Sequence, residues 1–120
     1  MYQTQVKIQR KEGSKPANEI YLVEAVGLTD VDFKLRTEFE KLLVAVDKCD
    51  TIAFDAIFET GEGTFFKIKV VYEDIDSKEI RELYLQEAAD EEQAREYFRK
   101  NVSSGEITDF NKTKIMGIIK

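Results

Sequence analysis

Two nearly identical pentapeptides, YLVEA at residues 21–25 and YLQEA at residues 84–88, recur in this chain of 120 residues. Each follows a segment in which apolar and polar side chains alternate, and each precedes a segment with helical periodicity. Because a recurring order of elements indicates that one supersecondary unit is built twice, this repetition is the feature that most constrains the fold. Glu24 and Glu87, the acids of the two pentapeptides, are expected to be solvated.

The first copy begins with a segment in which Tyr2, Thr4 and Val6 alternate with polar residues, the period of a half-buried strand. A turn-rich segment separates it from the second strand. Apolar residues then recur every three or four positions and predict an amphipathic helix, with Thr29 and Asp32 as its capping box. The predicted strand, turn, strand, helix, third strand and short tail span residues 2–8, 11–16, 20–25, 31–46, 51–54 and 56–58.

The second copy repeats this order, with Asp90 and Gln93 as a capping box before its helix. Its strand, turn, strand, helix, third strand and tail are predicted at residues 66–72, 73–78, 83–88, 94–102, 113–115 and 117–119. The offset between copies changes only where turns absorb it, being 64 for the first strands (Tyr2 to Phe66), 63 for the second (Tyr21 to Tyr84) and 61 for the tails (Ala56 to Gly117).

These elements predict an α+β fold made of two tandem ββαβ repeats, residues 1–60 and 64–120, joined by a glycine-containing linker at 60–64. Since 120 residues hardly provide two independent cores, the repeats are expected to share one core in a single domain, 1–120. The expected sheet is mainly antiparallel, with both helices on one face. The pattern leaves open whether the strands form one sheet or two.

The composition is acidic, with 24 acidic and 18 basic residues and a formal net charge of −6. No basic block indicates duplex DNA or an anionic membrane as a partner. The single Cys49 cannot form an intrachain disulfide, and the N-terminus lacks the charged and apolar regions of a signal peptide. A cytoplasmic location is therefore expected.

Little in the sequence indicates catalysis. The chain has no histidine, which removes the most common general base and a common metal ligand. Cys49 has no evident base and is expected to be a small structural thiol, and a single cysteine does not make a zinc site. Asp74 and Asp76 lack the glycine and the spacing of a calcium loop and predict an acidic hairpin turn. The linker 61–64 matches no phosphate-binding loop and predicts a flexible joint. We therefore expect no enzymatic activity, no cofactor and no metal.

The order YQTQVKI, YLVEA, helix, AIFE, followed by FFKIKVVY, YLQEA, helix, KIMGII, resembles a family of small uncharacterised two-repeat proteins from Bacteroides-type bacteria and their phages. The resemblance covers nearly the whole chain, but its motifs are short and structural. Because that family is a domain of unknown function, the resemblance implies a bacterial or phage setting and assigns no activity or functional residue.

The outer side of the two first strands is the most suggestive surface. If the alternating apolar residues face the core, polar and aromatic residues face outward, and no acid is among them. If the two strands are neighbours, these residues form one face with lysines, glutamines and an aromatic ring. We call the following set the candidate face: Gln3, Gln5, Lys7, Phe65, Lys67, Lys69 and Val71.

Two classes of function follow. The first is a small acidic, non-enzymatic module that works through contact with a protein partner or a second copy of itself, with acidity helping to attract a basic partner. The second is single-stranded nucleic-acid binding, in which lysines of the candidate face follow the phosphates and Phe65 stacks on a base. No membrane partner and no small-molecule substrate is indicated.

Overall fold

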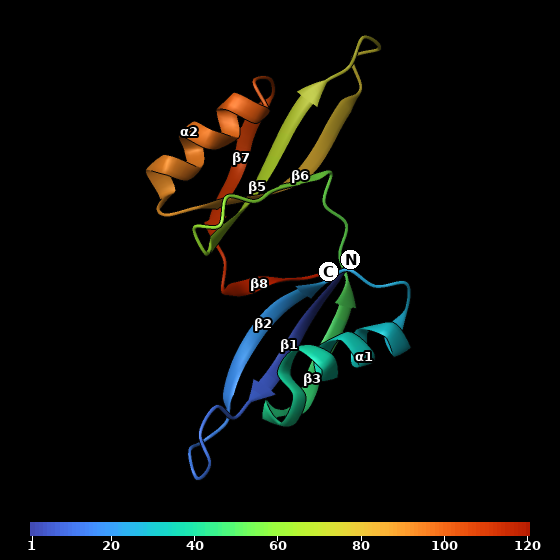
Figure 1. Ribbon diagram of the computed structural model, residues 1–120. Helices are drawn as coiled ribbons and strands as arrows, with labels where there is room; N and C mark the ends of the chain where they lie inside the picture. The colour runs from blue at the N-terminus through green and yellow to red at the C-terminus, as the bar shows by residue number, and fades with distance from the viewer. The chain divides into compact units, whose positions relative to one another are not determined.

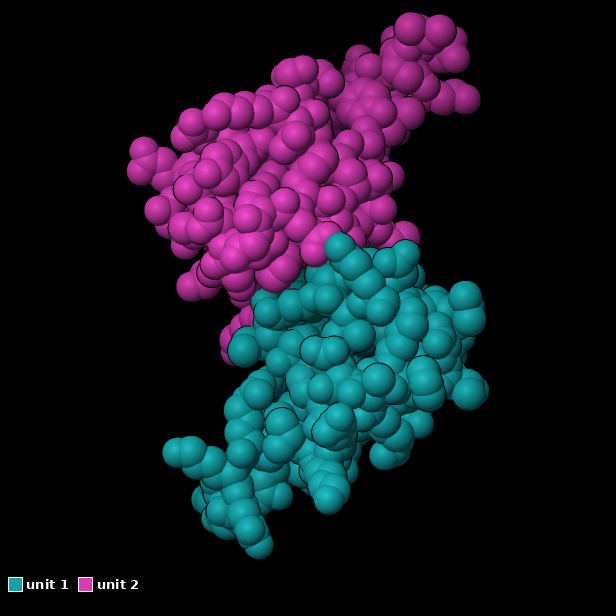
Figure 2. Space-filling model, viewed as in Figure 1, with its two compact units in different colours: residues 1–52, 115–120 teal, residues 53–114 magenta.

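The computed structural model describes residues 1–120 and divides them into two compact units. Unit 1 comprises Met1–Ile52 and Ile115–Lys120, and unit 2 comprises Ala53–Lys114 (Figure 2). The fold is α+β, as predicted, with two α-helices and eight strands in two four-stranded sheets (Figure 1). Neither helix has the length and apolar character needed to cross a membrane.

Unit 1 contains a sheet in the order β3-β1-β2-β8 and the helix α1. Strand β1 is antiparallel to both β2 and β3, whereas β8 joins β2 in parallel. A short 3-10 helix η1 links α1 to β3. The bounds are β1 Tyr2–Ile8, β2 Ala17–Val23, α1 Leu28–Phe39, η1 Glu40–Leu42, β3 Leu43–Thr51 and β8 Ile115–Ile119.

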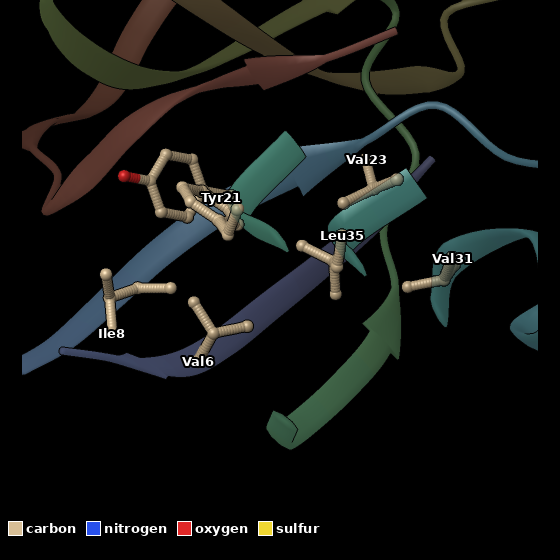
Figure 3. Close-up of a cluster of buried hydrophobic side chains, with 7 residues drawn as sticks. Val6, Ile8, Tyr21, Val23, Val31 and Leu35 are labelled. Carbon is tan, nitrogen blue, oxygen red and sulfur yellow. The ribbon is translucent and has the colours of Figure 1, made fainter. Parts of the chain in front are cut away.

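The core of unit 1 lies between its sheet and α1 (Figure 3). The alternation predicted for β1 buries Val6 and Ile8 on the side that faces the helix. From α1, Val31 and Leu35 lie four positions apart on one face of the helix and complete the cluster. The buried members are Val6, Ile8, Tyr21, Val23, Val31, Leu35 and Phe39.

Unit 2 contains a sheet in the order β4-β6-β5-β7 and the helix α2. Here β5 is antiparallel to β6 and β7, and β4 joins β6 in parallel. Phe98 of α2 packs against Ile68 and Tyr84 in the larger of two buried clusters, and its ring centroid lies 5.3 Å from that of Tyr84. The bounds are β4 Ala56–Phe58, β5 Thr64–Glu73, β6 Glu79–Ala88, α2 Glu91–Asn101 and β7 Glu106–Lys112.

The predicted architecture was right in one feature and wrong in another. The expectation of mainly antiparallel pairing was confirmed, since four of the six strand pairings are antiparallel, although β8 and β4 each add a parallel pair that makes both sheets mixed. The helices do not lie on one face, since α1 packs in unit 1 and α2 in unit 2. Each unit has buried clusters of its own. The strands form two sheets, which answers the question that the sequence pattern left open.

The third strands differ from the prediction as well. The predicted helix stripe continued to Val46, but α1 ends at Phe39 and Glu40 adopts a positive φ of 50°. Residues 43–51 form β3, and Val46 belongs to that strand with 36% of its surface exposed. Strand β7 was not predicted at all, and the strand predicted at 113–115 is instead a link followed by β8.

The two helix starts had different outcomes. The side chain of Asp90 accepts a hydrogen bond from the Gln93 N–H at 2.8 Å, and Gln93 in turn accepts one from the Ala89 N–H at 2.7 Å, which confirms the predicted cap of α2. The cap predicted at Thr29 was wrong, because α1 begins after Gly27 and has no side-chain cap.

The last strand of each half of the chain belongs to the sheet of the other unit. β4 follows β3 in sequence but pairs with β6, and β8 follows β7 but pairs with β2. The registers match, since Tyr21 lies opposite Gly117 and Tyr84 lies opposite Ala56. The two sheets therefore have the same pairing pattern, with β4 and β8 in equivalent positions.

Candidate functional site

The candidate face falls on two different sheets. Its first three residues belong to β1, whose neighbours are β2 and β3, and its last four belong to β5, whose neighbours are β6 and β7. The condition that the two first strands be neighbours is therefore not met. Each half of the candidate face has its own surroundings.

The half on β1 lies beside charged residues of β3. The Lys7 Nζ is 3.8 Å from the Asp47 Oδ2, and Gln3 and Gln5 lie opposite Asp50 and Lys48 in the β1–β3 register. The absence of acids on β1 itself is thus offset by acids on its neighbour.

The half on β5 is only partly exposed. Phe65 has 4% of its surface exposed, so the expectation that its ring faces outward was wrong. It lies opposite Glu87, which is 5% exposed, and its carbonyl oxygen accepts hydrogen bonds from the N–H and the hydroxyl of Thr113 at 2.9 and 2.8 Å. Phe66, the next residue along β5, is buried too, so the alternation of buried and exposed residues stops at this end of the strand.

The remaining residues of this half reach the surface. Lys69 is exposed, and its Nζ lies 3.6 Å from the Asp109 Oδ2 on β7. Lys67 lies opposite Leu85 and Asn111, and Val71 lies opposite Arg81. Acids of the adjoining strands therefore neutralise part of the positive charge.

A hollow of about 600 Å³ in unit 2 includes two residues of the candidate face, Lys69 and Val71. We call it the acidic groove. It is lined by Ala53, Asp55, Lys69, Val70, Val71, Glu79, Arg81, Glu82, Leu83, Thr108 and Asp109.

Acids outnumber bases in the acidic groove by four to two. Both bases are already paired, Lys69 with Asp109 and Arg81 with Glu79 at 3.2 Å. The other two carboxylates accept hydrogen bonds from neutral donors: Asp55 from the Leu83 N–H at 2.7 Å and Glu82 from the Tyr84 hydroxyl at 2.6 Å. Two negative charges are therefore left without a cation in the groove.

A tyrosine and a glutamate form the same pair in both units. The Tyr21 hydroxyl donates to the Glu19 Oε1 at 2.6 Å, matching the pair of Tyr84 and Glu82. Burial, followed by the neighbouring carboxylate, raises the pKa of Tyr21 to about 12 and also raises the pKa of Tyr84. Both phenols therefore stay protonated at neutral pH and act as donors.

The two pairs differ in their cation. In unit 1 the guanidinium of Arg10 forms an ion pair with Glu19 and lies 3.4 Å from the Tyr21 hydroxyl. In unit 2 the offset of 64 between first strands places Asp74 at the position that matches Arg10. Its carboxylate accepts hydrogen bonds from the N–H groups of Asp76 and Lys78, both at 2.9 Å, as in an acidic hairpin turn. The Glu82 pair thus lacks the arginine that its counterpart has.

The carboxylate of Glu87 binds the predicted linker. It accepts hydrogen bonds from the N–H groups of Thr60 at 2.9 Å and Gly63 at 2.6 Å. Burial by itself would raise the pKa of Glu87, but the N–H groups of Gly61, Gly63 and Thr60 together lower it. The expectation of a solvated carboxylate was wrong for Glu87, and the linker is held in place instead of being a free joint.

We call the hydrogen bonds between the Glu87 carboxylate and the N–H groups of residues 60–63 the clasp. The clasp depends on the two glycines of this segment. Gly61 and Gly63 have φ values of 85° and 95°, a region that other residues rarely adopt. These conformations turn successive N–H groups toward one anion, as in backbone nests. The sequence signal, two glycines flanking Glu62 after a strand, was visible but pointed to flexibility.

A second hollow of about 550 Å³ in unit 2 lies beside α2 and is lined in part by Gln86 and Tyr97. The Gln86 side chain is fully buried, and its amide nitrogen donates to the Glu87 carbonyl oxygen at 2.8 Å. Its Oε1 has no hydrogen-bond partner. In unit 1, Val23 occupies the matching place in the register.

The remaining chemistry is sparse. Cys49 is half-buried against the core of unit 1, and burial, with a smaller effect of Asp50, raises the pKa of its thiol, which favours the neutral form. No group of three or more cysteine, aspartate or glutamate side chains is arranged to hold a metal ion.

Fold and sites together define a small α+β protein of two mixed sheets with an acidic groove on one of them. The chain belongs to the family described as Domain of unknown function (DUF4494), which matches residues 1–120. No curated protein and no solved structure matches the chain.

Proposed function

We propose that the protein is a non-enzymatic binding module that recognises a basic segment of a protein partner at the acidic groove of unit 2. The observation that carries this proposal is the missing cation at Glu82. Glu19, the matching residue in unit 1, is neutralised by Arg10, whereas Glu82 receives tyrosine hydroxyls, from Tyr84 and Tyr72, and no cation.

Unit 1 provides a template for the contact. A guanidinium there binds Glu19 and reaches the Tyr21 hydroxyl as well. A partner's arginine placed on Glu82 and Tyr84 would form the same contacts, and its fixed fork of donors suits a carboxylate better than an ammonium does. Because the groove has an excess of negative charge, it disfavours acidic segments and attracts basic ones.

The doubled architecture is part of the proposal. We infer two tandem ββαβ repeats, supported by pairings that match at constant offsets: Thr4 lies opposite Tyr21 as Ile68 lies opposite Tyr84. The β1–β3 and β5–β7 pairings also shift register at matching places, after Gln5 and after Lys69. In this scheme one repeat has its own arginine and the other takes one from a partner. A cytoplasmic site of action and an origin in Bacteroides-type bacteria or their phages stay predictions.

Single-stranded nucleic acid is the alternative partner. The structure offers it less support, because Lys7 and Lys69 are paired with acids and Phe65 is buried. Self-association through the surface beside the half-buried Val71 is part of the protein-contact proposal. Both alternatives become outcomes of the same experiment.

The test is fluorescence anisotropy with a labelled arginine-containing peptide of apolar and basic residues at low and moderate salt. Glu82→Gln keeps an acceptor for Tyr84 but removes the charge, so binding should weaken roughly five-fold, about 1 kcal/mol. Glu38→Gln, the same change at an exposed position of α1, is the matched control and should bind like the wild type.

Equal binding by wild type and Glu82→Gln would contradict the proposed site. Binding of labelled single-stranded DNA in place of the peptide, lost on changing Lys67 and Lys69 to glutamate, would favour the alternative. Concentration-dependent dimers in light scattering, without peptide binding, would point to self-association.

A further inference from the structure

Strand β6 has an open edge in its N-terminal half. β6 spans Glu79–Ala88, but its neighbour β4 contains only Ala56–Phe58 and pairs with residues 84–86. On the other side β5 pairs with the whole of β6, from Glu79 to Ala88. No strand lies beside the outer edge of β6 before Leu83.

The hydrogen bonds between Asp55 and Leu83 show which way the backbone groups of β6 point along this edge. The Leu83 N–H donates to the Asp55 Oδ2 at 2.7 Å, and the Leu83 carbonyl accepts from the Asp55 N–H at 2.8 Å. Leu83 therefore directs its polar backbone groups away from β5. Since these directions alternate along a strand, the N–H and C=O groups of Arg81 and Glu79 point to the same open edge.

Asp55 imitates the end of a neighbouring strand, because it makes the pair of hydrogen bonds that a strand residue would make. An extended segment placed before it along β6 would continue the ladder to Arg81 and Glu79. Unpaired edges of this kind are templates for strand addition unless they are covered. Glu79 and Arg81 are both exposed.

We propose that the partner's basic segment binds as an added strand along β6, opposite residues 79–82, next to Asp55. This inference rests on the proposed function and names its mode of binding. Three acids, Asp55, Glu79 and Glu82, surround this edge together with a single base, Arg81. Electrostatic complementarity therefore favours a basic added strand.

Side-chain alternation then fixes a sequence pattern. Glu82 and Tyr84 lie on the helix side of the sheet, while Leu83 and Arg81 lie on the other. The residue of the added strand that lies opposite Glu82 points to the same side as Glu82 and is an arginine. Its two neighbours point to the side of Leu83 and Val71, where apolar side chains fit. The neighbour opposite Arg81 pairs with β6, whereas the other lies beyond the paired stretch, because Asp55 already binds the backbone groups of Leu83. The predicted core of the ligand is apolar, arginine, apolar.

The test uses the full chain and a labelled six-residue peptide with this pattern, measured by fluorescence anisotropy. Two N-methylated versions are compared, one at the amides expected to face β6 and one at the alternate amides. Strand addition predicts about ten-fold weaker binding for the first and less than two-fold for the second.

A protein variant provides the second arm. Arg81→Pro removes an N–H that points to the open edge and breaks no bond to β5, so it should reduce peptide binding about ten-fold. Arg81→Gln removes only the charge and should bind at least as well as the wild type.

The outcomes separate the two proposals. If the peptide binds but both N-methylated versions bind equally well, strand addition is overturned and the proposed function stands. If neither the six-residue peptide nor its N-methylated versions bind, and Glu82→Gln does not weaken binding of the arginine-containing peptide, strand addition and the proposed function both fail.

Discussion

Replacing Glu87 with glutamine should destabilise unit 2, because a buried carboxylate holds the segment between β4 and β5. Glu87 is 5% exposed and accepts N–H bonds from Thr60 and Gly63. Glutamine keeps one acceptor oxygen, but its NH₂ group would face an N–H donor, leaving that donor unpaired. A buried donor without a partner costs about 1–3 kcal/mol, so we expect a loss of about 2 kcal/mol in unfolding free energy.

A loss of this size should lower the Tm by roughly 6–12 °C in a chain of this length. Thermal unfolding followed by circular dichroism measures it, and amide exchange at Thr60 and Gly63 should accelerate locally. The matched control is Glu24→Gln, which changes the same residue of the other pentapeptide at an exposed position. It should alter stability by less than about 0.5 kcal/mol.

The effect should depend on pH in one direction. The pKa of Glu87 is lowered below its ordinary value of 4.5 in the folded protein, so its carboxylate contributes stability above that value. This contribution is lost as the pH falls through the lower, folded-state pKa. The stability gap between wild type and Glu87→Gln should therefore shrink below pH 4.5. A gap that stays constant to acid pH, or unchanged exchange at Gly63, would refute the clasp.

Three further predictions concern single residues. Gln86→Met removes a buried acceptor without a partner and should leave stability equal or higher by up to about 1 kcal/mol in urea unfolding, whereas a large loss would mean that Oε1 is satisfied. Gly105→Ala should cost at least about 2 kcal/mol in the same assay, since Gly105 has φ 90° and a Cβ would lie 2.3 Å from the Val70 Cγ1; a neutral result would contradict this packing. Spectrophotometric titration should find Tyr21 ionising near pH 12, and Arg10→Gln should move its pKa further up, because the guanidinium favours the phenolate; a downward shift would contradict the contact.

The elements with strong local signals were predictable from the sequence. The alternation in β1 and most of β5 gave the correct buried sides, and Asp90 with Gln93 located the start of α2. These patterns are local because the side-chain period and the cap are set within one turn or strand. The duplicated order of elements was read from the same kind of signal.

Other features depend on contacts distant in sequence. The first four residues of β3, 43–46, were interpreted as helix because Leu42 and Val46 continue the helical spacing by coincidence. Nothing local shows that Glu40 turns the chain. β7 is an edge strand with few buried residues, so its alternation is weak. The pairing of β4 with β6 and of β8 with β2 leaves no local mark at all.

The candidate site, too, depends on contacts between residues that are distant in sequence. The candidate face was free of acids along each strand, but Asp47 and Asp109 arrive from neighbouring strands. The acidic groove combines side chains from four segments, and the importance of Glu82 becomes visible only beside Glu19 and Arg10. The arginine that unit 2 lacks is recognisable only because Arg10, Glu19 and Tyr21 lie together in the fold of unit 1.

Backbone amide shift mapping by NMR can locate the bound peptide on the protein residue by residue. Uniformly ¹⁵N-labelled protein, residues 1–120, is titrated with the unmodified apolar-arginine-apolar peptide. We expect shifts concentrated at residues 79–83 and at Asp55, with little change at Gln3, Gln5 and Lys7. Shifts concentrated on β1, or no shifts at millimolar peptide, would contradict the assignment of the acidic groove as the binding site.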